Sequence, residues 1–141
     1  MEIRAYRPGD ESAVVSLWEE CGLTRPWNDP RKDIARKLLV QPELFLVGTF
    51  DGKVIATAMA GYDGPRGWVN YLAVAPRGRG CGRALMERVE HLLLSLGCPK
   101  VNIQVRSSNA EALGFYRAIG YAQEEIISLG KRLIPDDGTA A

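Results

Sequence analysis

The fold class of this chain is decided by residues 68–97, WVNYLAVAPRGRGCGRALMERVEHLLLSLG. An alternating apolar run typical of a β-strand comes first, a loop with glycines at every second position follows, and a helical stretch completes it. The apolar stripe of this helix consists of Leu85, Val89, Leu92, Leu93 and Leu96. A second strand-like run begins at Val101, after Gly97 and Pro99 have ended the helix. Strand, loop, helix and strand in this order predict one parallel crossover connection.

The remaining segments predict antiparallel strands and three further helices. Strand-like runs cover residues 2–6, 44–50, 54–62 and 121–134, the last as one strand or two. Helical patterns cover residues 10–21, 29–40 and 110–119. Asp51-Gly52 is a strong hairpin signal between two of the strands. The sequence therefore predicts a mixed α/β fold with a mostly antiparallel sheet and about four helices.

The composition excludes several classes of protein. A chain of 141 residues is most simply one domain, which we expect over residues 1–134 with a disordered tail at 135–141. Charged residues make up 25% of the chain, yet the formal net charge is only +1, which argues against a general nucleic-acid binder. The first residues lack the apolar run of a signal peptide, and no segment approaches the roughly 20 apolar residues of a membrane span.

The cysteines indicate neither a disulfide framework nor a zinc site. They are Cys21, Cys81 and Cys98, an odd number without a C-x-x-C spacing. We therefore expect no metal and a location in the reducing cytoplasm. Cys81 lies beside a helix N-terminus, where a thiolate is stabilised. A covalent acetyl-cysteine is one interpretation of this position, and a simple loop residue is the favoured one.

The glycine loop predicts a phosphate site. Gly78, Gly80 and Gly82 let the backbone approach an anion, and the N-terminus of the following helix offers unpaired N–H groups and a positive dipole end. The arginines between and beside these glycines can add charge-assisted hydrogen bonds. The loop matches neither the dinucleotide fingerprint G-x-G-x-x-G nor a P-loop. The alternative interpretation is a flexible glycine turn with solvated arginines.

Two motifs in this chain resemble the GNAT N-acetyltransferase superfamily. The loop is similar to the signature R/Q-x-x-G-x-G/A, with Arg77, Gly80 and Gly82 at its defining positions. Downstream, VRSSNAEALGFYRAIGY is similar to the segment V-x-x-x-N-x-x-A-x-x-x-Y-x-x-x-G-F/Y. The residues that match this segment are Asn109, Ala112, Tyr116, Gly120 and Tyr121. The order of elements fits the family as far as about Leu133, and the chain looks closest to its YpeA-like bacterial members.

The resemblance implies a fold in which the fourth and fifth strands splay apart around acetyl-coenzyme A. The backbone of Leu72, Ala73 and Val74 would then pair with the pantetheine arm like an added strand. The pyrophosphate would be bound by Arg77, Gly78, Arg79, Gly80, Cys81, Gly82 and Arg83. Asn109 would face the coenzyme near the splay. The family role implied for Tyr116 is that of a general acid that protonates the departing thiolate, and a backbone N–H near Leu72 is our candidate donor to the developing oxyanion.

The motifs do not indicate a general base. Some similar proteins have a glutamate where this chain has Gln104, and a neutral amide cannot take a proton. Asp29, Asp63, Tyr71 and a water chain are alternatives, and an amine deprotonated in solution needs no enzymic base. The proline–arginine connection at 76–77 is shorter than in many members, so the fourth strand is expected to end early or the loop to tilt.

We therefore predict an N-acetyltransferase that moves an acetyl group from acetyl-coenzyme A to a primary amine by direct transfer in a ternary complex. Two alternatives stay open, a non-catalytic acyl-coenzyme A sensor module of the same fold and a protein that binds another phosphate ligand. The sequence does not indicate the acceptor, a small molecule or a protein amine, and Trp27 either contacts it or pins its loop to the core. Homodimers are common among similar proteins, whereas no nucleic-acid, membrane or metal partner is expected.

Overall fold

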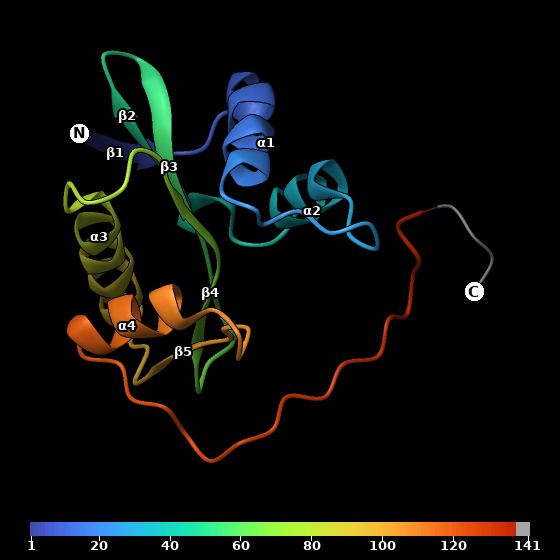
Figure 1. Cartoon of the computed structure of the whole chain (residues 1–141), viewed down its shortest axis with the longest axis vertical. Helices are drawn as coiled ribbons and strands as arrows, with labels where there is room; N and C mark the ends of the chain where they lie inside the picture. Colours follow the sequence, from blue (N-terminus) through green and yellow to red (C-terminus); the bar gives the residue numbers. More distant parts are fainter. Residues whose placement is uncertain (138–141) are drawn as a thin grey trace.

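A five-stranded sheet with the order β1-β2-β3-β4-β5 forms the centre of the computed structural model, which describes residues 1–137 (Figure 1). The strands are β1 (Glu2–Ala5), β2 (Phe45–Phe50), β3 (Lys53–Tyr62), β4 (Gly67–Val74) and β5 (Val101–Ile103). The first four strands pair antiparallel, and β5 pairs with β4 in parallel. The mixed sheet with one parallel crossover is therefore confirmed. β4 ends at Val74, just before the short connection at 76–77.

Four α-helices accompany the sheet within residues 1–137, as predicted. They are α1 (Glu11–Glu20), α2 (Pro30–Lys37), α3 (Cys81–Ser95) and α4 (Ala110–Ala118), with short 3₁₀ turns at Pro8–Asp10 and Pro42–Leu44. Asp29 caps α2, because its Oδ1 accepts hydrogen bonds from the backbone N–H groups of Arg31 at 2.9 Å and Lys32 at 3.4 Å. The helix ends before the predicted end near Val40, and the chain turns at Gln41, whose φ is 52°.

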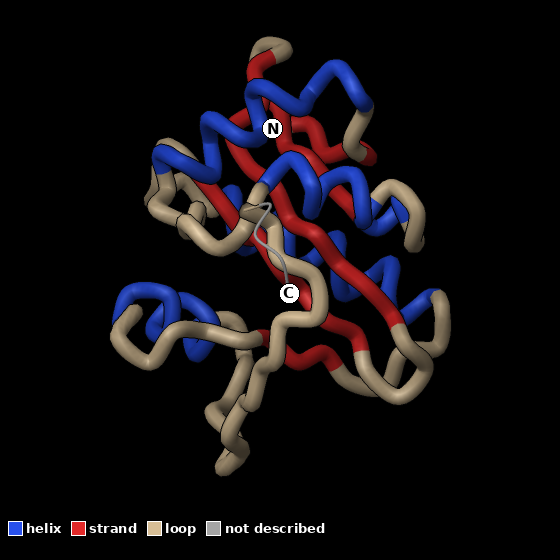
Figure 2. Tube along the Cα trace, turned by 90° about the vertical axis from the view of Figure 1, so that its right-hand side faces the viewer, coloured by secondary structure: helices blue, strands red, loops and turns tan. Residues whose placement is uncertain are grey.

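The helices lie in one layer on each face of the sheet (Figures 1 and 2). On one face, α1 packs on β2 and β3, where Trp18 and Phe45 are both fully buried. On the opposite face, α3 packs through Leu85, Val89 and Leu93, each no more than 1% exposed. Four residues of the predicted apolar stripe, Leu85, Val89, Leu92 and Leu93, therefore face the core, whereas the fifth, Leu96, is 51% exposed. Burial of large side chains such as these contributes about 1.5–3 kcal/mol each to folding, so the two layers hold the sheet from both sides.

The antiparallel meander β2–β3–β4 contains two local irregularities. Asp51 and Gly52 form the predicted hairpin turn, and both have positive φ angles, 50° and 75°, as the tight two-residue turn requires. In the next pair of strands, the register between β3 and β4 shifts between Thr57 and Met59, so β4 carries a β-bulge at this point. The bulge lies in the half of β4 that leads into the glycine loop.

Residues 121–134 form no strand, so this part of the sequence prediction was wrong. The segment 122–137, which we call the C-terminal arm, runs as an extended strap away from the sheet (Figure 1, orange to red). Several of its apolar side chains stay in water, with exposed fractions of 74% for Ile126, 84% for Ile127 and 91% for Leu129. Side-chain hydrogen bonds, such as that from Asn102 Nδ2 to Glu124 Oε1 at 2.6 Å, join the arm to β5. Within residues 1–137, β5 is the edge strand of the sheet and pairs only with β4, but the arm meets it through side chains and forms no backbone ladder with it, so the strand-like pattern gives no strand.

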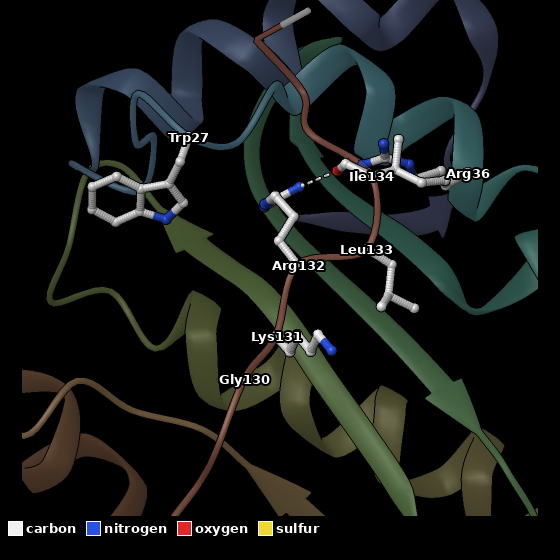
Figure 3. A pocket seen from close by; sticks show the side chains of 7 residues that line it. All are labelled: Trp27, Arg36, Gly130, Lys131, Arg132, Leu133 and Ile134. Carbon is white, nitrogen blue, oxygen red and sulfur yellow. Dashed lines mark hydrogen bonds between the residues drawn. The ribbon is translucent and has the colours of Figure 1, made fainter. Parts of the chain in front are cut away.

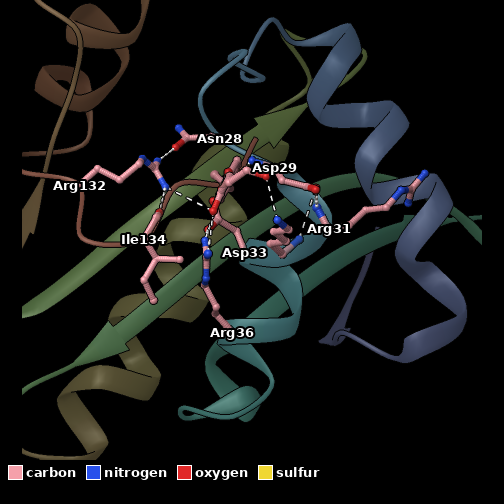
Figure 4. A network of polar contacts seen from close by, with 10 residues as sticks. Asn28, Asp29, Arg31, Asp33, Arg36, Arg132 and Ile134 are labelled. Carbon is pink, nitrogen blue, oxygen red and sulfur yellow. Dashed lines mark hydrogen bonds and ion pairs between the residues drawn. The ribbon is translucent and has the colours of Figure 1, made fainter. Parts of the chain in front are cut away.

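The far end of the arm is anchored on α2 (Figure 4). The Asp136 side chain, which is only 2% exposed, accepts hydrogen bonds from Arg36 Nη2 at 2.7 Å and from the backbone N–H of Asp29 at 2.8 Å. The Arg36 guanidinium, followed by the Asp29 amide, lowers the pKa of Asp136 from 3.8 to about 2. Asp136 belongs to the tail expected at 135–141, and the structure holds it in place. Residues 138–141 of that predicted tail lie outside the described residues.

Residues 1–137 contain neither a membrane-length apolar helix nor a cluster of metal-ligating side chains. No helix in this part of the chain is long and apolar enough to cross a bilayer. No group of three or more His, Cys, Asp or Glu side chains in it could hold a metal ion. The three cysteines are free thiols.

Candidate active site

A cavity of about 440 Å³ lies where the end of β4, the glycine loop, the start of α3 and the helix α4 meet. Its walls include eleven of the twelve residues that the sequence analysis proposed for the coenzyme. These eleven are Leu72, Ala73, Val74, Arg77, Gly78, Gly80, Cys81, Gly82, Arg83, Asn109 and Tyr116. Arg79 does not line the cavity. The two motifs, separated by more than twenty residues in the sequence, thus form one concave site.

The glycine loop has the backbone geometry of an anion site. Gly78 and Gly80 have φ angles of 83° and 74°, which residues with a side chain rarely adopt. No side chain caps the N-terminus of α3, so its first N–H groups remain available to a ligand. Gly82 lies in the first turn, where an added Cβ would be 3.1 Å from the Phe115 ring. The loop and α4 are therefore in close contact, and a side chain at this position would push them apart.

The two arginines that line the cavity already have partners on α4. Arg77 Nη1 lies 2.5 Å from Glu111 Oε1 in an ion pair that is exposed on both sides. Arg83 Nη2 donates a long hydrogen bond of 3.5 Å to the carbonyl oxygen of Ala118. A phosphate group placed here would compete with Glu111 for the guanidinium of Arg77.

Asn109 both lines the cavity and caps the helix α4. Its Oδ1 accepts a hydrogen bond from the backbone N–H of Ala112 at 3.0 Å and so caps α4. Gly120, with a φ of 100°, follows the end of this helix. The Asn109 carbonyl group is thus occupied by the cap, and the cap holds α4 in register against the cavity.

Tyr116 presents a neutral hydroxyl to the cavity. Its ring packs edge-on against Phe115 and Tyr121, with centroids 5.2 Å and 5.8 Å away. Burial alone raises the pKa of Tyr116 from 10.0 to about 12. Among the described residues the hydroxyl has no hydrogen-bond partner, in contrast to Tyr121, whose hydroxyl donates to Glu90 at 2.7 Å. The Tyr116 O–H is therefore protonated at physiological pH and available to a group in the cavity.

The residues considered as general bases lie outside this cavity and have other partners. Asp29 caps α2, and Asp63 accepts hydrogen bonds from the N–H of Arg66 at 3.0 Å and from Trp68 Nε1 at 3.1 Å in the turn before β4. The Tyr71 hydroxyl donates to Asp33 Oδ2 at 2.7 Å. Burial, and then this hydrogen bond, raise the pKa of Tyr71, so it keeps its proton at neutral pH.

Sequence reasoning missed several residues of the wall. Cys21 and Leu23 reach the cavity from the end of α1, and Cys21 Sγ lies 3.6 Å from the carbonyl oxygen of Val74. Burial raises the pKa of the Cys21 thiol, so it contributes a neutral surface. Glu111 and Phe115 come from α4. Glu111 and Phe115 are four positions apart, a spacing that places them on one side of a helix and could have indicated that they act together, whereas nothing local to Cys21 indicates its place.

A second cavity, of about 650 Å³, lies beside the C-terminal arm (Figure 3). Its lining residues are Trp27, Arg36, Gly130, Lys131, Arg132, Leu133 and Ile134. Trp27 is 52% exposed, so its ring forms a wall of this cavity and is not buried as a core residue. The arm is anchored to α2, so this cavity and the helices α1 and α2 belong to the same side of the sheet.

Comparison with known proteins shows the family of this chain. Residues 12–121 match the Acetyltransferase (GNAT) family. Over 138 residues the chain is 49% identical to "Acetyltransferase ECA0875" of Pectobacterium atrosepticum, a match that covers 96% of this chain and 98% of that protein. The chain belongs to the GNAT acetyltransferase family. It is accordingly an acyltransferase enzyme.

Solved structures share the fold. The aminoglycoside 6'-N-acetyltransferase AAC(6')-IG of Acinetobacter haemolyticus is similar with a TM-score of 0.76 at 16% identity, over 95% of this chain and 100% of that one. Ard1 of Thermoplasma volcanium is similar with a TM-score of 0.69 at 27% identity, over 86% of this chain and 82% of that one. These likenesses agree with the mixed sheet and the two helical layers described above.

Proposed function

We propose that this protein transfers the acetyl group of acetyl-coenzyme A to a primary amine, by direct attack of the amine within a ternary complex. The observation that carries the proposal is that one cavity joins the glycine loop, the edge of β4 and the Tyr116 hydroxyl. Acetyl-coenzyme A consists of a diphosphate, an extended amide-bearing arm and a thioester. An anion site, a strand edge and a hydroxyl donor match these three groups in kind and in order.

The binding roles follow from the positions of the residues. The N–H groups from Gly78 to Arg83 bind the pyrophosphate at the N-terminus of α3, and Arg77 adds its charge when it leaves Glu111. The backbone of β4 from Leu72 to Val74 pairs with the amides of the pantetheine arm. Support comes from AAC(6')-Iy, a solved structure with a TM-score of 0.76 at 19% identity that holds a bisubstrate analogue built on coenzyme A.

The chemical roles account for each proton and electron pair. The amine nitrogen attacks the thioester carbonyl carbon, and the negative charge that develops on the oxygen is stabilised by the N–H of Leu72. The carbon–sulfur bond then breaks, and its electron pair leaves on sulfur. Tyr116 donates its hydroxyl proton to this sulfur and regains a proton from solvent, while the amine nitrogen loses one proton to water. The products are an amide and a free thiol.

Three finer predictions from the sequence belong to this proposal. They are a likeness to the YpeA-like members, a cytoplasmic location and a homodimer. A solved structural neighbour, AAC(6')-Iy, is named as an aminoglycoside N-acetyltransferase, which supports an amine as the acceptor group. The cavity beside Trp27 and the arm is the proposed place for the acceptor, since it lies on the α1–α2 side of β4.

Two measurements test the proposal together. Calorimetry with acetyl-coenzyme A measures binding, and a thiol assay measures coenzyme A released in the presence of amino acids, polyamines, aminoglycosides and peptides with free amines. Binding together with amine-dependent thiol release supports the transfer reaction. Binding without release from any of these amines supports the non-catalytic alternative. Absence of binding overturns the proposal.

A further inference from the structure

The β-bulge in β4 places Tyr71 in an unfavourable backbone conformation. Thr57 lies opposite Ala73 and Met59 lies opposite Asn70, which leaves two residues of β4, at 71 and 72, opposite one residue of β3. The φ angle of Tyr71 is 53°, in the left-handed region. For an aromatic residue this conformation costs on the order of 1 kcal/mol or more, so surrounding contacts must hold it.

A chain of two hydrogen bonds holds the bulge from the α1 side of the sheet. Trp18 Nε1 lies 2.8 Å from Thr57 Oγ1, and Thr57 Oγ1 lies 2.8 Å from the carbonyl oxygen of Tyr71. Thr57 and Trp18 are both fully buried. The indole N–H can only donate, so the Thr57 oxygen accepts from Trp18 and its own hydrogen points to the Tyr71 carbonyl. The Trp18 and Tyr71 rings also stack, with centroids 3.8 Å apart.

The direction of the Leu72 amide follows from this arrangement. The carbonyl of Tyr71 and the N–H of Leu72 belong to one planar trans peptide group, so they point in opposite directions. Because Thr57 holds the carbonyl on the side of α1, the N–H is directed away from that layer. Leu72 itself packs with the cluster on the α3 side and lines the cavity of the glycine loop.

We propose that the Thr57 hydroxyl, oriented by Trp18, is a positioning group that aims the Leu72 N–H at the thioester oxygen. This inference rests on the proposed function and assigns a role to two residues that do not touch the substrate. A donor to an oxyanion is effective only when its direction is fixed before the reaction, and removal of one such donor lowers kcat about 10²–10³-fold in well-studied enzymes. Loss of the positioning group therefore lowers kcat by a part of that factor.

The test compares Thr57→Val with Thr57→Ser. Valine keeps the shape of threonine and removes the hydroxyl, so we expect kcat to fall about tenfold or more, with the KM for acetyl-coenzyme A within about twofold of the wild-type value. Serine keeps the hydroxyl and restores kcat to within about threefold. Thr49→Val is the matched control, because Thr49 is also buried, at 5% exposed, but lies in β2 away from the bulge. Its kcat stays at the wild-type level.

A second readout does not depend on turnover. The backbone amide resonance of Leu72 is followed by NMR while acetyl-coenzyme A is added. In the wild type this signal moves as the amide meets the thioester oxygen, and in Thr57→Val it moves much less. The Leu72 signal can shift in the wild type and not in Thr57→Val while no amine causes release of free coenzyme A thiol. In that case the proposed transfer function is wrong and the positioning role of Thr57 stands.

Three outcomes overturn the inference. The first is a Thr57→Val protein with wild-type kcat and a wild-type Leu72 signal, and the second is a Thr57→Ser protein as impaired as the valine variant. The third is absence of acetyl-coenzyme A binding, which overturns the proposed function as well. Where circular dichroism shows that Thr57→Val does not fold, Trp18→Phe replaces it, because phenylalanine keeps a ring on Tyr71 and removes the N–H that orients Thr57.

Discussion

Replacement of Tyr116 by phenylalanine removes the hydroxyl that faces the cavity and leaves the ring in place. Burial raises the pKa of this hydroxyl to about 12. A thiol has a pKa of about 8.5, so full proton transfer from Tyr116 to a thiolate in the ground state is uphill by about 5 kcal/mol. The hydroxyl therefore acts mainly by a hydrogen bond to the charge that develops on sulfur, and the proton follows as the thiol forms.

The size of the effect follows from the strength of that bond. A hydrogen bond to a charged group contributes about 1.5–3 kcal/mol, which corresponds to a loss of about 10- to 150-fold in kcat for Tyr116→Phe. The dissociation constant of acetyl-coenzyme A stays within about twofold, because the ring still packs against Phe115 and Tyr121. The loss is the same from pH 6 to pH 10, since Tyr116 ionises only near pH 12.

Thiol release at saturating acetyl-coenzyme A measures kcat, and calorimetry measures binding. Tyr121→Phe is the matched control. It lies in the same aromatic cluster, but its hydroxyl donates to Glu90, so its loss lowers the melting temperature without changing kcat. The reasoning is refuted if Tyr116→Phe turns over within twofold of the wild type with unchanged binding, or if its loss of activity follows the ionisation of a group near neutral pH.

Three further changes test other parts of the structure. Glu111→Gln releases Arg77 from its ion pair. An exposed ion pair contributes at most about 1 kcal/mol, so calorimetry at low salt should show that acetyl-coenzyme A binds up to about fivefold tighter. Weaker binding would contradict the role of Arg77. Gly80→Ala forces a side chain into a φ of 74°, which costs about 1–2 kcal/mol and lowers the melting temperature together with coenzyme affinity; unchanged stability would show that the loop adapts. Asp136→Asn removes a carboxylate whose pKa of about 2 lies below its ordinary value of 3.8. In the wild type this carboxylate adds to the free energy of unfolding above about pH 4, and the contribution is lost as the pH falls through about 2. In urea titrations the free energy of unfolding of the variant lacks this part of the pH dependence. The variant's arm is also cut faster by proteases at pH 7, and equal rates would mean that Asp136 does not anchor it.

The features that could be predicted from the sequence are those with local causes. The crossover unit was predictable because its strand, glycine loop and helical stripe each follow from residues within a few positions of one another. The hairpin at Asp51-Gly52 and the cap at Asn109 are local in the same sense. The two motifs share one cavity because the family fold brings them together, which only the resemblance could indicate.

The features that were missed depend on contacts between distant residues. Residues 121–134 have the composition of a strand, but strand formation needs backbone pairing with a neighbouring strand, and no local signal reports whether that pairing forms. The contact of Tyr71 with Asp33 spans 38 positions, and that of Trp18 with Thr57 spans 39. A threonine in a strand and a tryptophan in a helix both look like ordinary core residues until the fold brings them to one peptide group.

The C-terminal arm has a consequence for how the protein can change. Its apolar side chains add almost nothing to the core. The arm is held by polar side-chain contacts along its length, made by Glu124, Ser128, Arg132 and Asp136. Residues 125–134 add only exposed polar contacts, such as that of Ser128 with Gln104. This stretch can be replaced or lengthened at little cost in folding free energy, because exposed polar contacts contribute little and loop closure depends only weakly on length. One wall of the cavity beside Trp27 is thus free to vary while the glycine loop and the sheet stay as they are. Under the proposed placement of the acceptor in this cavity, selectivity for that acceptor can diversify without a matching loss of thermal resistance.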